Sequence, residues 1–448
     1  MALKKTTTAA LLASALVVLG SGWMLHARAQ QAPAAVEAAP GAASAALVER
    51  GRYLALAGDC AACHTAKDGK PFAGGMAIAS PIGKIYSTNI TPDQATGIGD
   101  YSFEDFDRAL RQGIARDGTT LYPAMPYASY AKVSPADARA LYEFLMHGVR
   151  PVAQSNHAED IAWPLSMRCP LAFWRRMFAP AVTTADAPAP NDASARGRYL
   201  VEGLEHCGAC HTPRGFGLQE KALADDGKLY LSGGTIDDHL AKNLRGDAAD
   251  GLGAWSEAEI VAFLKGGRST HSAAFGPMGE VVGASTQYLE DADLHAIAAY
   301  LKTLAPAHAG QVALVQDATA AAALRAGTDR SNGALTFVDN CAACHRTTGN
   351  GYDQTFPQLA RSTTINTDDP TSLIHLVLSG GEMPSTRTAP THYGMPAFAD
   401  RLTDRDVADV LTFVRSSWGN RAPAVTPEQV GKIRKAIGAA QPGRGENG

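Results

Sequence analysis

The chain has 448 residues, of which 46% are hydrophobic and 19% charged, and its formal net charge is −4. This composition is typical of a protein that buries hydrophobic cores, and it excludes a disordered acidic or basic chain. It also argues against nucleic acid as a partner, because nucleic-acid-binding proteins usually carry a strong basic excess.

The first segment, 1–29, has the pattern of a secretory signal peptide. Lys4 and Lys5 precede an uncharged, mostly apolar run at 9–25, and the sequence ARA at 27–29 is a cleavage signal. We therefore expect export and cleavage. A retained membrane anchor is the alternative, because the apolar run is at the lower limit of membrane-spanning length. In both cases the body of the protein lies outside the cytoplasm.

The rest of the chain repeats one pattern in three units, which we place at 46–180, 193–308 and 327–425. Each unit opens with a short predicted helix that leads into C-x-x-C-H. The helices are contained in ERGRYLALAGDC, ARGRYLVEGLEHC and the looser copy SNGALTFVDNC. A fixed order of repeated segments predicts repeated structural units.

Units one and two share a second predicted helix. Ser102 and Ser256 fit helix N-caps, and the helices that follow end at Gly113 and Gly267. Unit three keeps only the end of this pattern, in DPTSLIHLVLSGG.

Every unit closes with a segment of helical apolar period: SPADARALYEFLMHG, LEDADLHAIAAYLKTLAP and LTDRDVADVLTFVRSSWGN. A Pro/Ala-rich linker at 179–195 and an Ala-rich, partly helical segment at 305–327 separate the units. The predicted fold is mainly α, with three tandem helical domains. A C-terminal tail at 426–448 places apolar residues on one face, and it is either an amphipathic membrane contact or a solvated tail.

Three chemistries compete for the C-x-x-C-H motifs. A redox dithiol would follow a strand in a βαβ unit, and zinc would require two such pairs within one unit. Neither pattern is present, whereas C-x-x-C-H is the signature of covalent c-type haem attachment. The sequence therefore predicts three haems bound through Cys60, Cys63, Cys207, Cys210, Cys341 and Cys344, with His64, His211 and His345 on the three irons.

Methionine is the usual second axial ligand of an electron-transfer haem. Met125 follows Gly113 by 12 residues, and Met278 follows Gly267 by 11. In unit three, Met395 and Met383 lie 14 and 2 residues after Gly381. We expect Met125, Met278 and Met395 to be the ligands, with Met383 the weaker candidate.

Three features remain outside this scheme. We expect Cys169 to be a small buried hydrophobe and His206 to be exposed. The segment WPLSMRCPLAFWRRMF is either an apolar docking strip or a packed inter-domain segment. No residue is assigned a catalytic role, because no dinucleotide-binding or other substrate motif is present.

The segments PIGKIYSTNITPDQATGIGDYSFEDFDRALRQGIARDGTTLYPAMPYASYAKVS, WPLSMRCPLAFWRRMFAP and SSWGNRAPAV resemble the triheme cytochrome c subunit of membrane-bound dehydrogenases. These include gluconate 2-dehydrogenase, sorbitol and fructose dehydrogenases and quinoprotein alcohol dehydrogenase. The resemblance covers about 46–425 and implies the same haem residues as the motif reasoning. Cys169 departs from it, since an aromatic or bulky residue is expected there.

The resemblance implies an electron-transfer subunit on the periplasmic face of the inner membrane. It would take electrons from a catalytic subunit holding flavin or pyrroloquinoline quinone and deliver them to ubiquinone or another acceptor. A gluconate or polyol flavoprotein is the favoured partner. The alternatives are a quinoprotein alcohol dehydrogenase and a molybdenum hydroxylase. A haem enzyme such as a peroxidase is a remote alternative, since it would need an open iron.

Overall fold

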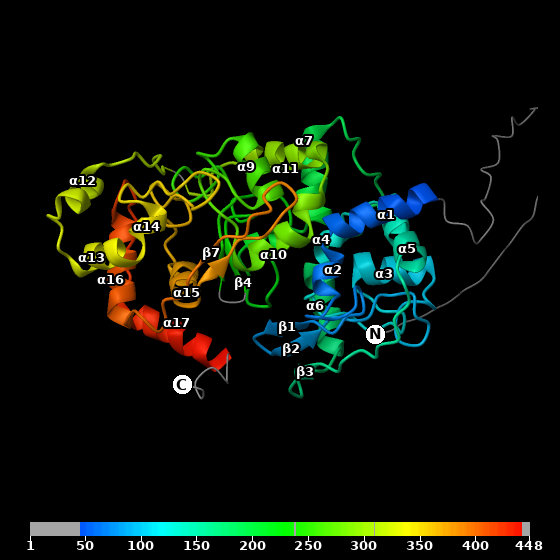
Figure 1. Ribbon diagram of the computed structural model, residues 1–448. Helices are drawn as coiled ribbons and strands as arrows, with labels where there is room; N and C mark the ends of the chain where they lie inside the picture. The colour runs from blue at the N-terminus through cyan, green and yellow to red at the C-terminus, as the bar shows by residue number, and fades with distance from the viewer. Residues whose placement is uncertain (1–44, 237–238, 309, 441–448) are drawn as a thin grey trace, which may run out of the picture. The chain divides into compact units, whose positions relative to one another are not determined.

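The computed structural model describes residues 45–236, 239–308 and 310–440. The expected signal peptide at 1–29 and the last eight residues of the chain lie outside the described residues. The described part is mainly helical (Figure 1), and short antiparallel strand pairs accompany the helices. The predicted mainly α class is confirmed.

Unit one is built in this order: α1 (Ala45–Ala57), α2 (Cys60–Cys63), β1 (Ala77–Ser80), β2 (Gly83–Tyr86), α3 (Phe103–Gln112), α4 (Tyr127–Tyr130), α5 (Pro135–His147), β3 (Asp160–Ile161) and α6 (Cys169–Phe178). The three strands form an antiparallel sheet in the order β1-β2-β3, in which Ile78 pairs with Ile85 and Gly83 with Ile161.

Unit two contains α7 (Ala193–Tyr199), a turn of π-helix (Leu200–Leu204), α8 (Gly208–His211), β4 (Gly234–Ile236), β5 (His239–Ala241), α9 (Glu257–Gly266), α10 (Gly276–Ala284), a 3₁₀ turn (Thr286–Tyr288) and α11 (Asp291–Thr303). Unit three contains α12 (Thr319–Ala326), α13 (Asn332–Asn340), α14 (Ala342–His345), α15 (Thr371–Ser379), β6 (Gly381–Glu382), β7 (Gly394–Met395), α16 (Asp404–Ser416) and α17 (Pro427–Ala440).

The predicted caps are confirmed. The Ser102 side chain accepts a hydrogen bond from the backbone N–H of Asp105 at the start of α3, and Ser256 does the same with Glu259 at the start of α9. The helices end at Gly113 and Gly267, whose φ angles of 66° and 71° lie in the left-handed region that favours glycine.

The opening and closing helices of each unit cross in direct backbone contact, and this contact explains the glycine of each opening helix. A Cβ on Gly51 of α1 would lie 1.9 Å from the Ala140 carbonyl oxygen of α5. The same contact recurs at 1.9 Å between Gly197 and Ala296, and at 2.3 Å between Gly333 and Asp409. No side chain fits at these distances, so glycine is required at all three crossings.

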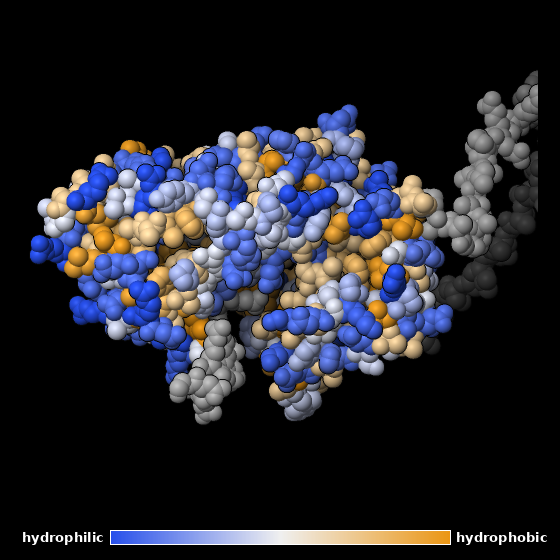
Figure 2. All heavy atoms as spheres, viewed as in Figure 1, coloured by the Kyte–Doolittle hydropathy of each residue, from blue (hydrophilic) through white to orange (hydrophobic). Residues whose placement is uncertain are grey.

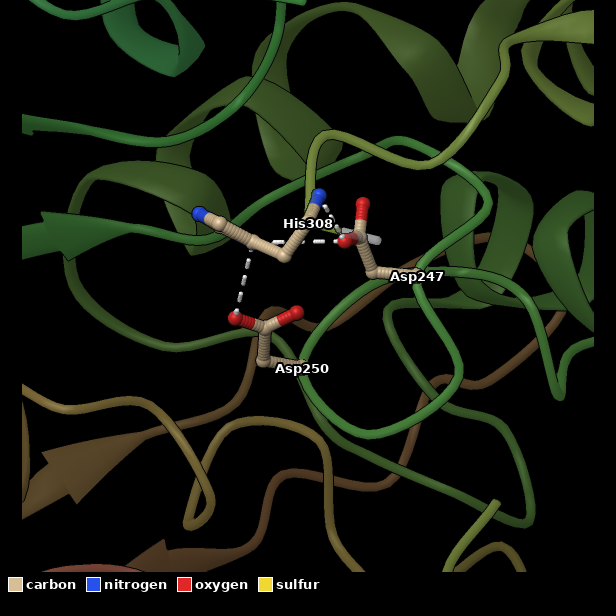
Figure 3. A group of neighbouring side chains, drawn as sticks. All are labelled: Asp247, Asp250 and His308. Carbon is tan, nitrogen blue, oxygen red and sulfur yellow. Dashed lines mark hydrogen bonds and ion pairs between the residues drawn. The ribbon is translucent and has the colours of Figure 1, made fainter. Parts of the chain in front are cut away.

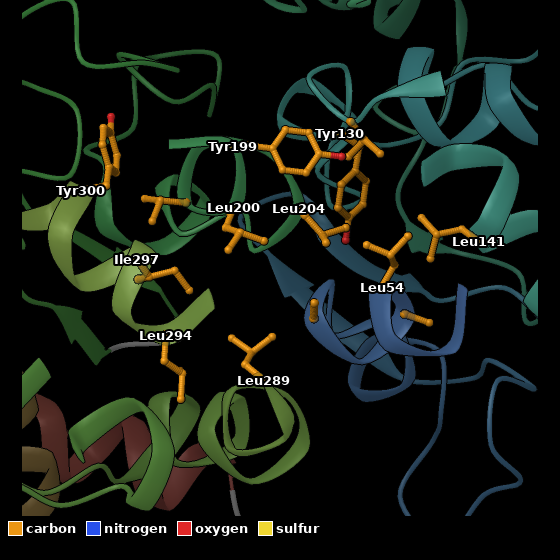
Figure 4. Close-up of a cluster of buried hydrophobic side chains, with 14 of the residues drawn as sticks. Leu54, Tyr130, Leu141, Tyr199, Leu200, Leu204, Leu289, Leu294, Ile297 and Tyr300 are labelled. Carbon is orange, nitrogen blue, oxygen red and sulfur yellow. The ribbon is translucent and has the colours of Figure 1, made fainter. Parts of the chain in front are cut away.

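Units one and two share one hydrophobic cluster, and Figure 4 shows its centre. Leu54 of α1 and Leu141 of α5 belong to the same cluster as Leu200, Leu294 and Ile297 of unit two. Unit three has a separate cluster around Phe337, Phe413 and Trp418. The repeats are therefore not three equivalent, independent cores.

Units one and two exchange a pair of hydrogen bonds, because a tyrosine of each unit donates to an aspartate of the other. The Tyr53 hydroxyl of unit one donates to Asp293 Oδ2 of unit two at 2.6 Å, and the Tyr199 hydroxyl of unit two donates to Asp137 Oδ2 of unit one at 2.6 Å. Each aspartate also pairs with an arginine of its own unit, Arg196 or Arg50. The corresponding position of unit three is Leu335, which cannot donate and is 49% exposed.

The apolar face of the C-terminal helix is not available for the membrane contact considered above. In α17, Val430 is fully buried, and Ile433 and Ile437 pack against the hydrophobic cluster of unit three. Arg434 pairs with Asp404 at 2.7 Å and donates to backbone carbonyls of the same unit. The helix completes the core of unit three, because its apolar face covers side chains that water would otherwise reach.

No helix among the described residues has the length and hydropathy needed to cross a bilayer. On the face drawn in Figure 2, hydrophilic residues predominate and hydrophobic side chains gather in separate patches.

Candidate haem sites

Each C-x-x-C-H motif forms a single helical turn. The backbone N–H of the histidine donates to the carbonyl of the first cysteine in every copy, at 2.9 Å for His64, 3.0 Å for His211 and 3.0 Å for His345. Residues three apart on a helix lie on the same side. The turn therefore presents both thiols to one side, as attachment to two substituents of one ring requires.

The three histidines share a second contact that fixes how their rings are oriented. Nδ1 lies 2.7 Å from the Thr88 carbonyl in His64, 2.7 Å from the Lys242 carbonyl in His211 and 3.0 Å from the Pro357 carbonyl in His345. A carbonyl only accepts hydrogen bonds, so each Nδ1 carries the proton and each Nε2 keeps its lone pair. Neutral imidazole with a free Nε2 is a preferred ligand of iron.

Burial supports the same protonation state. It lowers the pKa of His64 and His345, and it lowers the pKa of His211 to about 4, with the backbone hydrogen bond acting in the opposite direction. At neutral pH all three rings are therefore uncharged.

The first thiol of each motif lacks the lowered pKa of a reactive cysteine. Burial raises the pKa of Cys60 to about 12 and that of Cys63 and Cys341 to about 11. A reactive dithiol requires a lowered pKa, because the thiolate is the nucleophile. These values argue against the dithiol alternative.

The zinc alternative also lacks a ligand set. In the part of the chain that the structure describes, the one group of three or more His, Cys, Asp or Glu residues with metal-ligand spacing is Asp247, Asp250 and His308, and it contains no cysteine. Figure 3 shows this group. Asp247 accepts the backbone N–H groups of Ala307 and His308 at 2.7 Å each, so its carboxylate joins two loops.

A largely apolar cavity lies beside the motif of unit three. Cys341, Cys344 and His345 line one side of it, and Leu373, Leu376, Val410, Leu411 and Val414 contribute to its walls. Both Met383 and Met395 line this cavity, because β6 and β7 pair with Gly381 opposite Met395. The residues fit a haem, and the choice of Met395 over Met383 stays a prediction.

The cavity of unit two is built from all three units. Cys207, Cys210 and His211 line it together with Met278, which lies in the first turn of α10. Ala57 and Asp59 of unit one and Thr364 and Ser372 of unit three complete the lining. The cavity of unit two is therefore bounded by both neighbouring units.

The cavities of units two and three adjoin. Residues Ser272 to Phe275, which precede α10, and Thr364 of unit three line both. In unit one, Cys60 and Met125 are both partly buried against the shared hydrophobic cluster, and α2 packs against α10. The second cavity thus adjoins the third and is lined by Asp59, the residue just before the motif of unit one.

The sequence analysis did not identify three ionisable residues that line the second cavity. Lys242 lies 4.7 Å above the Trp255 ring and donates to Thr363, and burial lowers its pKa to about 7. Burial, and to a lesser degree Glu280, raises the pKa of Asp59 to about 7. Burial also raises the pKa of Glu205. The available sequence signal was that Asp59 and Glu205 lie just before a motif.

Two expectations are wrong. His206 is not exposed: its backbone has a φ of 40°, its ring lies 5.5 Å from that of Tyr130, and it lines the second cavity. Cys169 is exposed rather than buried, because it is the first residue of α6, a helix with no buried residue.

Comparison with known proteins agrees with this geometry. The cytochrome c family model matches residues 48–148, 194–305 and 331–418. The chain is 56% identical to the gluconate 2-dehydrogenase cytochrome c subunit of Pantoea cypripedii over 88% of this chain and 90% of that protein. It is 52% identical to the cytochrome c subunit of the quinone alcohol dehydrogenase of Komagataeibacter europaeus, over 88% and 85%. It is 38% identical to the fructose dehydrogenase cytochrome subunit of Gluconobacter japonicus, over 89% and 85%.

The family match repeats at each of the three units, so the cofactor of every unit is a c-type haem. On these grounds the chain belongs to the cytochrome c family.

Proposed function

We propose that this chain is the electron-relay subunit of a dehydrogenase complex, accepting electrons from a separate catalytic subunit and delivering them to ubiquinone. The observation that carries the proposal is the threefold repetition of a histidine whose Nδ1 is bound to a backbone carbonyl beside a pair of thiols. A c-type haem held at such a site exchanges one electron at a time. Relatives named as cytochrome subunits of dehydrogenases match most of the chain, which supports this role.

The arrangement of the cavities supports a relay. The second cavity is lined by residues of units one and three, and it shares wall residues with the third. An electron that reaches one unit is therefore next to a neighbouring site. The apolar side chains that line the cavities exclude water, and the backbone carbonyls of Thr88, Lys242 and Pro357 fix the histidine rings.

We assign the haem attachments to the six motif cysteines and the iron ligands to the three motif histidines with Met125, Met278 and Met395. With these ligands each iron would have no open position for a substrate. A peroxidase-type activity is therefore disfavoured, and the chemistry on the organic substrate belongs to the partner.

The favoured partner is a flavin-containing gluconate or polyol dehydrogenase subunit. Support comes from the 56% identity to the gluconate 2-dehydrogenase subunit, compared with 52% for the alcohol dehydrogenase subunit. The second candidate is a quinoprotein alcohol dehydrogenase. A molybdenum hydroxylase is third.

Co-purification with a tagged copy of this chain from its native cells tests the choice of partner. A flavin-containing subunit, together with reduction of the haems by gluconate in the purified complex, is the expected result. A pyrroloquinoline-quinone subunit and reduction by ethanol would replace the first candidate with the second. A molybdopterin subunit would contradict both.

We propose that the protein lies on the periplasmic face of the inner membrane, and the signal-peptide pattern at 1–29 supports this location. Protease treatment of spheroplasts tests this location. The chain should be digested while a cytoplasmic marker stays intact, and protection of both would contradict the proposal.

A further inference from the structure

An unusual concentration of exposed hydrophobic side chains lies at the end of unit one. Among the described residues, fourteen large hydrophobic side chains are exposed, and seven of these belong to one region. We call this region the aromatic surface and define it as Trp163, Leu165, Met167, Phe173, Met177, Phe216 and Leu218. Phe216 is 92% exposed, Trp163 79% and Phe173 65%. Large groups of exposed apolar side chains mark interaction sites, whereas single scattered ones do not.

The two segments of the aromatic surface are joined by direct contacts. Trp174 of α6 donates a hydrogen bond from Nε1 to the Gly217 carbonyl at 2.7 Å. Phe178 at the end of α6 contacts both Trp174, at 5.3 Å between ring centres, and Phe216, at 6.3 Å. The loop at 216–218 therefore lies beside α6, and Trp163, Leu165 and Met167 directly precede α6 in the chain.

This surface is also anchored to the body of unit one. The Trp174 ring packs edge-on against Tyr127, 6.2 Å away, and Arg168 lies 4.0 Å from the centre of the Tyr122 ring. Arg168 also donates to the Thr120 carbonyl at 3.2 Å. These contacts attach α6 to the loop that carries Met125, so the exposure does not come from a detached segment.

The charge of the segment indicates what binds there. Between Ile161 and Val182 the sequence contains no aspartate or glutamate and three arginines, although the whole chain has a net charge of −4. Arg168 is paired with Glu159, whereas Arg176 is exposed. Protruding aromatic, leucine and methionine side chains next to an exposed positive charge favour binding at a membrane interface, where the apolar side chains enter the headgroup region and the charge meets anionic lipids.

We propose that the aromatic surface binds a phospholipid bilayer that contains anionic lipids, with Trp163, Phe173 and Phe216 inserted at the level of the headgroups. This inference deepens the proposed function, because it rests on the chain working at a membrane and names the surface that touches it. It also brings the Met125 side of unit one towards the phase in which ubiquinone dissolves.

Flotation of the haem-loaded full chain with vesicles tests the proposal. The protein should float with vesicles of phosphatidylglycerol and phosphatidylcholine, and more weakly with phosphatidylcholine alone. A variant combining Trp163→Ser, Phe173→Ser and Phe216→Ser should lower the partition coefficient by about tenfold or more, since three large side chains no longer leave water. All three are exposed, so the haem spectrum and thermal midpoint should be unchanged.

Matched controls test whether lipid binding depends on this surface in particular or on any exposed apolar side chain or arginine. Leu335→Ser with Val338→Ser removes exposed apolar side chains of unit three, which are 49% and 44% exposed, and should leave flotation unchanged. Arg176→Gln should weaken binding to the anionic vesicles only. Arg325→Gln, at an exposed position of α12, should not.

Two results would overturn the proposal: a wild-type protein that does not float, or a triple variant that floats as well as the wild type. If the triple variant floats normally but is no longer reduced by the catalytic subunit, the surface binds a protein instead. Electron transfer from the partner in detergent solution is measured separately, so failure of the relay is distinguished from failure of lipid binding.

Discussion

At the scale of single residues, the decisive feature is a hydrogen bond rather than the motif. C-x-x-C-H is readable in the sequence, but the acceptors Thr88, Lys242 and Pro357 follow their histidines by different distances along the chain. No common spacing could have identified them. The motif cysteines, by contrast, can be predicted without a structure, because the C-x-x-C-H signature of haem attachment is local in sequence.

Met395→Ala tests the ligand assignment in unit three. Removing the sixth ligand should open one iron, so the reduced variant should bind carbon monoxide at one haem, as seen by its absorbance spectrum. Met383→Ala is the matched control, because both methionines line the same cavity. Carbon monoxide binding by the Met383 variant, with none by the Met395 variant, would reverse the assignment.

At the scale of elements, the repeat predicted the helices well and their contacts poorly. The caps at Ser102 and Ser256 follow from local chemistry. The tyrosine of the G-R-Y-L repeat gives no local sign that its hydroxyl binds an aspartate of the other unit. The presence of tyrosine in copies one and two, and of Leu335 in copy three, was the only signal. The strands β1 and β2, which form a local hairpin, were also missed, and so was the long-range pairing of β2 with residues 160–161.

Tyr53→Phe tests the exchanged contact. Loss of a hydrogen bond to a buried carboxylate should cost about 1.5–3 kcal/mol of unfolding free energy at pH 7, measured by denaturant titration. Tyr199→Phe should cost a similar amount. Tyr352→Phe, at a residue that is 47% exposed, is the control and should cost little. Equal effects in all three variants would contradict the role of the exchange.

The same pair predicts an acid response. Burial acts to raise the pKa of Asp293, but hydrogen bonds from Arg196 and Tyr53 outweigh it and the net shift is downward. The pair therefore stabilises the fold fully above the ordinary pKa of aspartate and loses that contribution as the pH falls through the lowered value. Tyr53→Phe should move acid unfolding to higher pH.

The C-terminal helix gives a further prediction at this scale. Val430 is fully buried in unit three, so Val430→Ala should destabilise that unit by about 2 kcal/mol. Lys432→Ala, on the same helix, should have little effect. Membrane release by Val430→Ala at unchanged stability would instead restore the amphipathic-anchor interpretation.

At the scale of the whole molecule, the sequence indicated three similar domains, whereas the structure makes units one and two a joined pair and leaves unit three with its own core. The joint core was not predictable, because the same apolar positions of a helix serve an intramolecular core or an interface equally well. The second cavity draws on all three units for the same reason. Its position between neighbours is what a relay of single electrons requires.

The measurement that tests the relay most directly is reduction of the isolated, oxidised, haem-loaded chain, followed by its visible spectrum. With gluconate alone the haems should stay oxidised. After the catalytic subunit is added, all three should be reduced by gluconate and reoxidised by a ubiquinone analogue. Reduction by substrate without the catalytic subunit, or none in its presence, would contradict the account.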